Sequence, residues 1–279
     1  MCNSGRERPY SKAFPIPHSP FLIAMIHPTA IVDPSARIGA DTTVGPYCVI
    51  GAGVEIGAGC TIHNHVTVAG PTRIGDGNTV FPYCSIGQRT QDLKYAGEPT
   101  FLEIGNHNSF REFCTVNRGT APGSKTVVGN HGNFLAYSHI AHDCVVGDHV
   151  IFSNNGTLAG HVIVEDHAVI GGLAGVHQFC RIGQHAITGG CTKIVQDVPP
   201  FMIADGNPAE VRGINQVGLE RRGFSAEAVK SLREAYRIIY RANLNTKQAL
   251  EAIREQIPAN PQIDALVAFI ETSKRGIVR

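Results

Sequence analysis

The sequence lacks tryptophan and carries little charge: 17% of its 279 residues are Asp, Glu, Lys or Arg, and the formal net charge is +1. Proteins that bind nucleic acid usually show a basic stripe or a known motif, and neither occurs here. No apolar run is long enough to span a membrane. The apolar stretch within the proline-rich residues 1–25 is too short for a signal peptide. These absences predict a cytoplasmic protein with a loose extension at residues 1–25, no nucleic-acid partner and no stable membrane insertion.

A repeat of six residues dominates what the sequence does contain. Every sixth residue from Ile26 to Ile86 is Ile or Val, and the same phase is mostly apolar from Ile104 to Ile194, often with glycine next. This period fits neither an α-helix nor a hairpin meander. It fits a solenoid whose short strands each send one branched side chain inward. Three repeats per coil predict an all-β triangular prism, a parallel β-helix over residues 26–198.

The cysteines follow the same repeat. The chain has 8 cysteines but no C-x-x-C pair, which argues against a zinc ribbon or a redox motif. Free cysteine behaves as a small buried apolar residue. We therefore predict burial for the cysteines that lie four residues after the repeated apolar position, namely Cys48, Cys60, Cys84, Cys114, Cys144 and Cys180.

Two segments interrupt the repeat and are predicted to be loops on one face of the solenoid. They are residues 88–101, "QRTQDLKYAGEPTF", and residues 118–126, "RGTAPGSKT". Loops inserted into a solenoid often carry function. The first one contains Gln91, Asp92 and Lys94, although an ordinary solvated loop would also be polar.

After Pro199-Pro200 the repeat gives way to helical spacing, so residues 199–279 are predicted to form a small α-helical domain. In "FSAEAVKSLREAYRIIYR" the predicted N-cap is Ser225. One face of the predicted helix carries Val229, Leu232, Tyr236 and Ile239.

The 13 histidines fall into different positions of the repeat. Seven lie three residues after the apolar position and are expected to point outward without a special role: His65, His107, His131, His149, His161, His167 and His185. His139, His142 and His177 occupy other positions. Residues about one coil apart are vertical neighbours, roughly 4.8 Å per coil. We therefore expect His142, His161 and His177 to form one vertical stripe.

A functional stripe of this kind suits general-base chemistry. Imidazole titrates near neutral pH, and Asp143 could orient the neighbouring His142 at a corner. No Ser or Cys nucleophile is paired with a base, which favours direct transfer over a covalent enzyme intermediate. Two alternatives stay open: an exposed stripe without function, and a catalytic zinc site, since three histidines can hold zinc.

Several segments also carry a resemblance to a known family. They are "QDLKYAGEPT", "HIAHDC", "LAGHV", "GVHQFC", "GGC", "QDVPP" and "GLERRGFS", in this order, within a match from about Ile26 to Arg279. The chain resembles the UDP-N-acetylglucosamine acyltransferases that catalyse the first step of lipid A synthesis. The resemblance implies that the β-helix is left-handed and that three copies form a homotrimer with active sites between subunits.

The same resemblance implies a reaction. An (R)-3-hydroxyacyl group would pass from acyl carrier protein to the 3-hydroxyl of UDP-N-acetylglucosamine, with no metal and no cofactor beyond the phosphopantetheine thioester of the carrier. His142 would be the general base, Asp143 would orient it, and the N–H of Gly160 would stabilise the oxyanion.

Substrate-binding roles are implied for a larger set. Asp92 and Lys94, with Gln91 beside them, would bind the sugar nucleotide or the acyl product. The cleft would be lined by His139, His161, His177 and Gln178, and the phosphates and uracil would meet Asn215, Arg221 and Arg222. Gly190 falls where the family sets acyl length, so its missing side chain predicts a long acyl chain, although Gly189-Gly190 also suits a simple turn.

Three positions depart from the family pattern: Pro208 stands where a His often contacts the nucleotide, Val217 where a Glu is common, and Asn117 in place of a frequent His. All bear on the sugar nucleotide, so a related UDP-sugar such as the 3-amino analogue stays open as acceptor.

Three other functions fit the sequence less well. The sister N-acyltransferase of the pathway carries a sizeable N-terminal domain, for which residues 1–25 are too short. A carbonic anhydrase-like zinc enzyme would not need "QDLKYAGEPT" or "GLERRGFS". A non-enzymatic scaffold would leave the long loop, the histidines and the arginine pair without a purpose.

Overall fold

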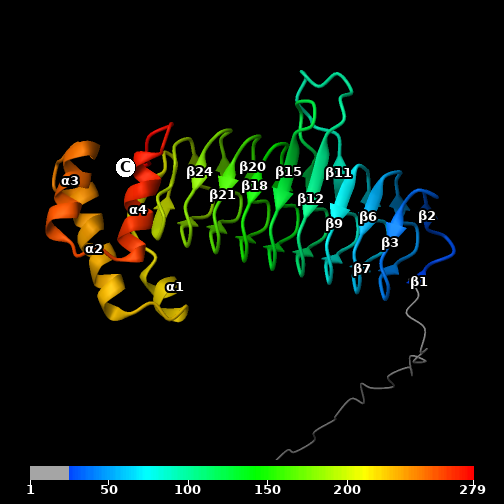
Figure 1. Ribbon diagram of the computed structural model, residues 1–279, viewed down its shortest axis with the longest axis horizontal. Helices are drawn as coiled ribbons and strands as arrows, with labels where there is room; N and C mark the ends of the chain where they lie inside the picture. The colour runs from blue at the N-terminus through cyan, green and yellow to red at the C-terminus, as the bar shows by residue number, and fades with distance from the viewer. Residues whose placement is uncertain (1–24) are drawn as a thin grey trace, which may run out of the picture.

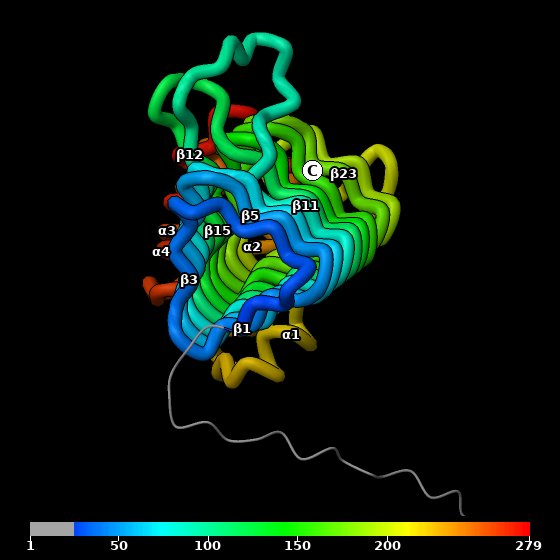
Figure 2. Tube along the Cα trace, turned by 90° about the vertical axis from the view of Figure 1, so that its right-hand side faces the viewer, coloured from blue at the N-terminus to red at the C-terminus, as the bar shows by residue number. Residues whose placement is uncertain are grey.

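The computed structural model describes residues 25–279, so the extension predicted at residues 1–25 lies outside the described residues except for Met25. The described chain is an elongated β-helix with four helices at its C-terminal end (Figure 1). Seen from the N-terminal end, the chain runs counter-clockwise through three sheets as it recedes, so the β-helix is left-handed (Figure 2). No helix in residues 25–279 is both long and apolar enough to cross a membrane.

The first face of the prism, sheet A, has 11 strands. They are β1 (Met25–Ile26), β4 (Thr43–Val44), β7 (Thr61–Ile62), β10 (Thr79–Val80), β13 (Ser109–Phe110), β16 (Asn133–Phe134), β19 (Ile151–Phe152), β22 (Val169–Ile170), β25 (Ile187–Thr188), β27 (Met202–Asp205) and β28 (Glu210–Ile214). All pair in parallel except β27 and β28, which form an antiparallel pair. Sheet A therefore continues past residue 198, where the sequence predicted the β-helix to end.

Sheet B, the second face, has 9 strands: β2 (Ile31–Val32), β5 (Val49–Ile50), β8 (Thr67–Val68), β11 (Ser85–Gln88), β14 (Thr115–Asn117), β17 (His139–Ile140), β20 (Thr157–Leu158), β23 (Gly175–Val176) and β26 (Lys193–Ile194). Sheet C, the third, has 8: β3 (Arg37–Ile38), β6 (Val54–Ile56), β9 (Thr72–Ile74), β12 (Phe101–Ile104), β15 (Lys125–Val128), β18 (Val145–Val146), β21 (Ile163–Val164) and β24 (Arg181–Ile182). We name the edges between faces the A–B, B–C and C–A corners.

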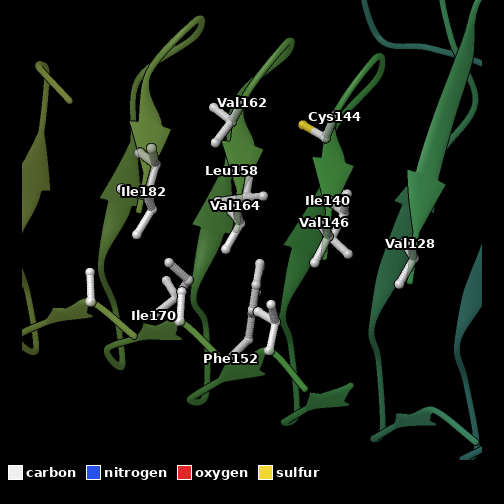
Figure 3. Packing of buried hydrophobic residues seen from close by; sticks show 14 of the residues in the cluster. Val128, Ile140, Cys144, Val146, Phe152, Leu158, Val162, Val164, Ile170 and Ile182 are labelled. Atoms are coloured by element: carbon white, nitrogen blue, oxygen red, sulfur yellow. The ribbon is translucent and has the colours of Figure 1, made fainter. Parts of the chain in front are cut away.

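The repeated apolar residue of each strand points into the prism, as predicted. Figure 3 shows Ile140 and Leu158 from sheet B, Val146 and Val164 from sheet C and Phe152 from sheet A packing in the interior. Each is at most 1% exposed, and burial of such a side chain contributes about 1.5–3 kcal/mol. The prediction for the cysteines is also confirmed, because the six named above are at most 1% exposed.

Most corners place one residue in the left-handed backbone region. The seven histidines that share a position of the repeat all lie there, with φ between 56° and 61°. His, Asn and Asp tolerate this conformation better than most residues. The position of these histidines in the repeat thus has a backbone explanation.

The two predicted loops lie at the B–C corner. They connect β11 to β12 and β14 to β15, and residues 88, 101, 125 and 126 at their ends already belong to these strands. The longer loop stands away from the prism (Figure 1). Backbone bonds join the two loops: the N–H of Arg118 donates to the carbonyl of Gln88 at 2.9 Å, and that of Gly123 to Pro99 at 2.8 Å.

The C-terminal helices are α1 (Gln216–Arg221), α2 (Ala226–Arg241), α3 (Thr246–Gln256) and α4 (Pro261–Glu271). The predicted N-cap is confirmed, because Ser225 Oγ accepts a hydrogen bond from the N–H of Ala228. The guanidinium of Arg181 in β24 lies 4.1 Å from the ring centroid of Phe269 in α4. This contact, and the hydrogen bond from Ser273 Oγ to Asp197 Oδ2, connect the end of the helical region to the last coils.

Candidate active site

A cavity of about 700 Å³ lies along the outer face of sheet B, next to the B–C corner. It is lined by residues of the longer loop, of three successive coils and of β26. Among the predicted site residues, the lining includes Gln91, Asp92, Lys94, His139, His142, Gly160, His177 and Gln178. The fold therefore brings together residues up to 87 positions apart in the chain.

His142 and Asp143 form a close pair at this corner. His142 Nδ1 lies 2.8 Å from Asp143 Oδ2, and the two side chains are 13% and 8% exposed. Burial opposes ionisation of Asp143, but the polar side chains of Ser124 and His142 and the nearby His161 outweigh it, so its pKa lies below the ordinary value. The carboxylate accepts a hydrogen bond from Nδ1–H, and in that tautomer His142 Nε2 carries no proton and can act as a base.

Gly160 lies directly beside the base. A Cβ built on Gly160 would be 2.4 Å from His142 Nε2, so only glycine leaves room for the ring. No hydrogen bond from the Gly160 N–H is found within residues 25–279. An unpaired N–H next to a general base can stabilise a developing oxyanion.

His161 adds to this cluster, although the predicted vertical stripe is wrong. His161 Nε2 is 3.8 Å from Asp143 Oδ2, and its ring meets that of His142 edge-on at 5.1 Å. His177 lines the cavity but is exposed. The three histidines occupy three adjacent columns, because His142, His161 and His177 stand two, three and one residues after their apolar positions.

His139 lies on the outer face of sheet B, one residue before the corner. Its Nδ1 is 2.7 Å from Thr115 Oγ1 in the preceding coil. Burial, and then the proximity of His142, lowers the pKa of His139. A largely neutral imidazole at this place can accept or donate a hydrogen bond to a ligand.

Asn215, Arg221 and Arg222 do not line the cavity of the same chain. Asn215 is 3% exposed and forms the N-cap of α1, where its Oδ1 accepts from the N–H of Gly218 and its amide donates to the carbonyl of His185. The expectation that its side chain opens toward a nucleotide is therefore not met in the single chain, because the helix end and the last coils use it.

Arg222 lies at the C–A corner. Its Nη1 donates to the carbonyl of His167 and to His185 Nδ1, both at 3.1 Å. Burial, followed by His167 and Arg222, lowers the pKa of His185 to about 4. A neutral His185 can therefore accept from the guanidinium.

Gly190 lies at the A–B corner, on the edge of sheet B opposite His142. A Cβ built there would meet only the carbonyl oxygen of Gly172, at 3.5 Å. At Gly189, by contrast, it would lie 2.0 Å from Asp205 Oδ1. The fold thus requires glycine at position 189 and does not require it at position 190.

The departures from the family pattern have different surroundings. Val217, in α1, is 75% exposed. Asn117 is 4% exposed, and its amide donates to the carbonyl of Arg89 at 3.2 Å. Pro208 follows a cis peptide bond in the turn between β27 and β28.

Lys193 lines the cavity and was missed by the sequence analysis. Its position in the repeat gave a signal, because His139, Thr157, Gly175 and Lys193 stand one residue before the apolar position in successive coils and pair across sheet B. Thr90 and Thr120 in the two loops also escaped notice, and no repeat covers them.

One group of side chains in the described part of the chain has the donors for a metal ion. The ligand atoms of His142, Asp143 and His161 lie within 4.8 Å of one another. Two imidazoles and a carboxylate are a plausible zinc set. The same geometry serves a base and its orienting carboxylate, so the donors alone do not separate the two chemistries.

Comparison with family models matches two parts of the chain. Residues 197–278 match the model described as UDP N-acetylglucosamine O-acyltransferase, domain 2. Residues 24–58 and 35–70 match the model of the bacterial transferase hexapeptide repeat.

Curated relatives resemble almost the whole chain. An acyl-[acyl-carrier-protein]–UDP-N-acetylglucosamine O-acyltransferase of Thiobacillus denitrificans is 49% identical over 92% of this chain and all of its own length. The protein of the same name from Verminephrobacter eiseniae is 51% identical over 91% of this chain and 99% of its own.

Solved structures agree with these relatives. LpxA from Acinetobacter baumannii superposes with a TM-score of 0.88 at 48% identity, and a UDP-N-acetylglucosamine acyltransferase from Bacteroides fragilis with 0.89 at 41% identity. Each comparison covers 91% of this chain and 100% of the other.

Proposed function

The chain belongs to the UDP-N-acetylglucosamine O-acyltransferase family and is an acyltransferase, and we propose that it acylates UDP-N-acetylglucosamine with His142 as general base. The donor is a 3-hydroxyacyl group on acyl carrier protein, and the reaction is the first step of lipid A synthesis. The observation that carries the residue assignment is the pair of His142 and Asp143 at 2.8 Å, at the edge of the cavity and beside the N–H of Gly160.

The chemistry follows from this arrangement. His142 Nε2 accepts the proton of the sugar 3-hydroxyl as that oxygen attacks the thioester carbonyl. The N–H of Gly160 donates to the resulting oxyanion. When the tetrahedral intermediate collapses, the carbon–sulfur bond breaks and His142 returns the proton to the leaving thiolate. The products are the acylated sugar nucleotide and the free thiol of the carrier.

Asp143 has a fixed task in this scheme. Its carboxylate holds Nδ1–H of His142 and stabilises the imidazolium that forms during attack. The lowered pKa of Asp143 keeps it ionised at neutral pH. No metal or cofactor takes part, apart from the phosphopantetheine thioester that the donor brings.

The remaining cavity residues receive the substrates. Asp92 and Lys94, with Gln91, extend from residues 88–101, which we name the substrate loop, and bind the sugar nucleotide or the acyl product. His139, His177 and Gln178 line the cavity, and His161 lies beside Asp143 next to it. The acyl chain crosses the outer face of sheet B past Gly175, where a Cβ would meet nothing within 4 Å, and ends near Gly190. A position without a side chain favours a long acyl chain.

We further propose that three copies form a homotrimer with the active site between subunits. The cavity lies at the B–C corner, whereas Arg221 and Arg222 belong to α1 and to the residue after it, beside the C–A corner. A neighbouring copy that brings its C–A corner against the cavity would add both guanidinium groups, whose planar fork suits phosphate. Asn215 then acts by fixing α1. The cytoplasmic location remains a prediction.

A direct assay tests this function. The purified protein is incubated with UDP-N-acetylglucosamine and a series of 3-hydroxyacyl carrier proteins of different length, with a chelator and no added metal, and the products are weighed by mass spectrometry. We expect a singly acylated sugar nucleotide, formed best from a long-chain donor. Absence of product with the chelator, and its recovery with zinc, would instead support a metal enzyme at His142, Asp143 and His161. If product formed only with the 3-amino analogue of the sugar, the acceptor would be that analogue, and the assignment of His142 as general base would still hold.

A further inference from the structure

A chain of hydrogen bonds links the substrate loop to the catalytic carboxylate. In the substrate loop, Thr90 Oγ1 accepts from the N–H of Asp92 at 3.0 Å. The same oxygen accepts from the hydroxyl of Thr120 at 2.8 Å. Thr120 belongs to residues 118–126, which we name the short loop. The two threonines are 30 residues apart in sequence and meet only because both loops leave the same corner.

This series of hydrogen bonds ends at Asp143 Oδ2, the atom that orients His142. The N–H of Thr120 donates to Asp143 Oδ2 at 3.1 Å. That oxygen is also the partner of His142 Nδ1 at 2.8 Å. The place of Oδ2, and with it the direction of the imidazole, therefore depends on where the short loop holds the N–H of Thr120.

The hydroxyl contact between the two threonines is not needed to hold the loops together. Four backbone bonds already do so: from Arg118 to Gln88, from Gly123 to Pro99, from Gly119 to Phe101 and from Phe101 to Ser124. Asp143 is held separately, because its N–H donates to Thr126 Oγ1 at 2.8 Å. The Thr90–Thr120 contact is largely buried. Because the loops and the Asp143 backbone are already held by other bonds, this contact should affect the position of the Asp143 carboxylate and leave the fold of the loops intact.

We propose that Thr90 and Thr120 are positioning residues that transmit the conformation of the substrate loop to Asp143. When Asp92 and its neighbours close on the sugar nucleotide, the N–H of Asp92 fixes Thr90, Thr90 fixes Thr120, and Thr120 sets the carboxylate that orients His142. Contacts of the acceptor with the substrate loop would then hold in place the catalytic geometry that these hydrogen bonds already set. The inference rests on the proposed function, because it assigns the substrate loop to the acceptor.

The test is a set of double-mutant cycles on the full-length protein. The variants Thr120→Val and Thr90→Val remove the hydroxyl contact, and Thr120→Ser keeps the hydroxyl. Each is made in the wild-type and in the Asp143→Asn background, and kcat and KM for UDP-N-acetylglucosamine are measured. Thr72→Val is the matched control, because Thr72 is a buried threonine of sheet C whose hydroxyl donates to the carbonyl of Ala69 at the same corner, without a link to Asp143.

We expect Thr120→Val to lower kcat by about tenfold with KM changed by less than about threefold, since a misplaced catalytic group mainly affects the transition state. Thr90→Val should lower kcat similarly and also raise KM, because Asp92 loses its partner. In the Asp143→Asn background both effects on kcat should shrink to less than about twofold. Thr120→Ser and Thr72→Val should keep kcat within about twofold of the wild type.

The proposal fails if Thr120→Val leaves kcat unchanged. It also fails if Thr120→Val lowers kcat by the same factor in the Asp143→Asn background, because the substitution would then act on the loops in general and not through the carboxylate. Thermal unfolding of each variant identifies misfolding, and Thr90→Val then tests the same contact from its other end. Loss of activity in Thr120→Ser also contradicts it. A wild-type protein that forms no acylated UDP-sugar would overturn the proposed function itself, whereas an active wild type with additive cycles overturns only the link.

Discussion

The B–C and C–A corners of the prism use the same backbone turn and both carry histidines, yet only one of them has catalytic geometry. At the C–A corner five histidines in the left-handed position stack with ring centroids between 4.6 and 5.2 Å apart: His107, His131, His149, His167 and His185. At the B–C corner the same position holds Asp143, then His161, then Phe179, and His142 precedes Asp143. The repeat fixes where a side chain leaves the backbone, but chemistry needs a base and a carboxylate side by side.

The inserted loops complete the difference. Both emerge at the B–C corner, and one of them donates a backbone N–H to Asp143. The C–A corner in these coils has tight turns without such loops, so its histidines stack on one another and meet the guanidinium of Arg222 only at the end. A solenoid therefore gains a site where its repeat is interrupted.

The largest effect should come from exchanging one histidine at each corner for asparagine. His142→Asn removes the general base, so kcat should fall by about 10²–10⁴-fold. His149→Asn, in the exposed stack, should leave kcat within about twofold, because asparagine tolerates the left-handed backbone of that position. Steady-state kinetics of the two variants in parallel measure this contrast. Equal losses would show that the stack matters to catalysis and would erase the distinction between the corners.

Glycines at the two corners should separate activity from stability. A Cβ at Gly160 would lie 2.4 Å from His142 Nε2, so Gly160→Ala should displace the ring and lower kcat by about 10²-fold, with a small change in Tm. A Cβ at Gly147 would lie 2.3 Å from Asp166 Oδ1, which accepts from the N–H of Asp148. Gly147→Ala should therefore lower Tm. Kinetics and thermal unfolding of both proteins check this, and the reverse pattern would contradict it.

The A–B corner offers a third kind of effect, on specificity. Gly190→Met should fold normally, since a Cβ there has only an ordinary contact, and should shift the preferred acyl donor to a shorter chain. We expect discrimination of roughly tenfold or more against the original donor, as methylene-scale changes in a pocket produce. Gly189→Ala, one residue earlier, should instead destabilise the protein, because its Cβ would collide with Asp205. Competition between donors of different length, with the products identified by mass, measures the change in preferred acyl length. An unchanged preference in Gly190→Met would show that the acyl chain does not pass position 190.

The smallest effect concerns the pH dependence of the C–A corner. The pKa of His185 is lowered to about 4, mainly by burial and then by His167 and Arg222, with Asp166 opposing. Below pH 6.5 the unfolded chain therefore binds a proton that the folded chain does not, and stability falls as pH drops from 6.5 toward 4. His185→Asn should reduce this fall by a few degrees in Tm, at about 2–4 °C per kcal/mol. The same measurement on His149→Asn is the control, and an identical pH profile for wild type and His185→Asn would exclude His185 as a cause.

Much of the site was within reach of the sequence. The pair His142-Asp143 is adjacent in the chain, and the loop with Asp92 and Lys94 is marked by the broken repeat. The place of Lys193 in the cavity could have been derived from the register of the repeat, because Lys193 occupies the same position as His139 three coils later. The vertical stripe of histidines failed because a difference of one residue at a corner turns a side chain to another column.

Other features could not be derived from the chain. Asn215 and Arg222 were named only through the family resemblance, as residues that meet the nucleotide. Their contacts with His185 join segments 30 and 37 residues apart through non-repeating structure. The link between Thr90 and Thr120 depends on the conformations of two irregular loops. No periodicity constrains such segments, so their side-chain contacts are decided by packing.

By itself, the sequence determined the prism, its buried columns of Ile, Val and Cys, and the corners where histidine accepts a left-handed backbone. These follow from a local repeat, because each coil places equivalent residues at equivalent depths. Only the tertiary structure decided which histidine meets a carboxylate, which N–H remains unpaired beside it, and how the two loops reach Asp143. Those contacts join residues distant in the chain over a few ångströms, and they depend on how the loops pack across the coils rather than on the spacing of the repeat.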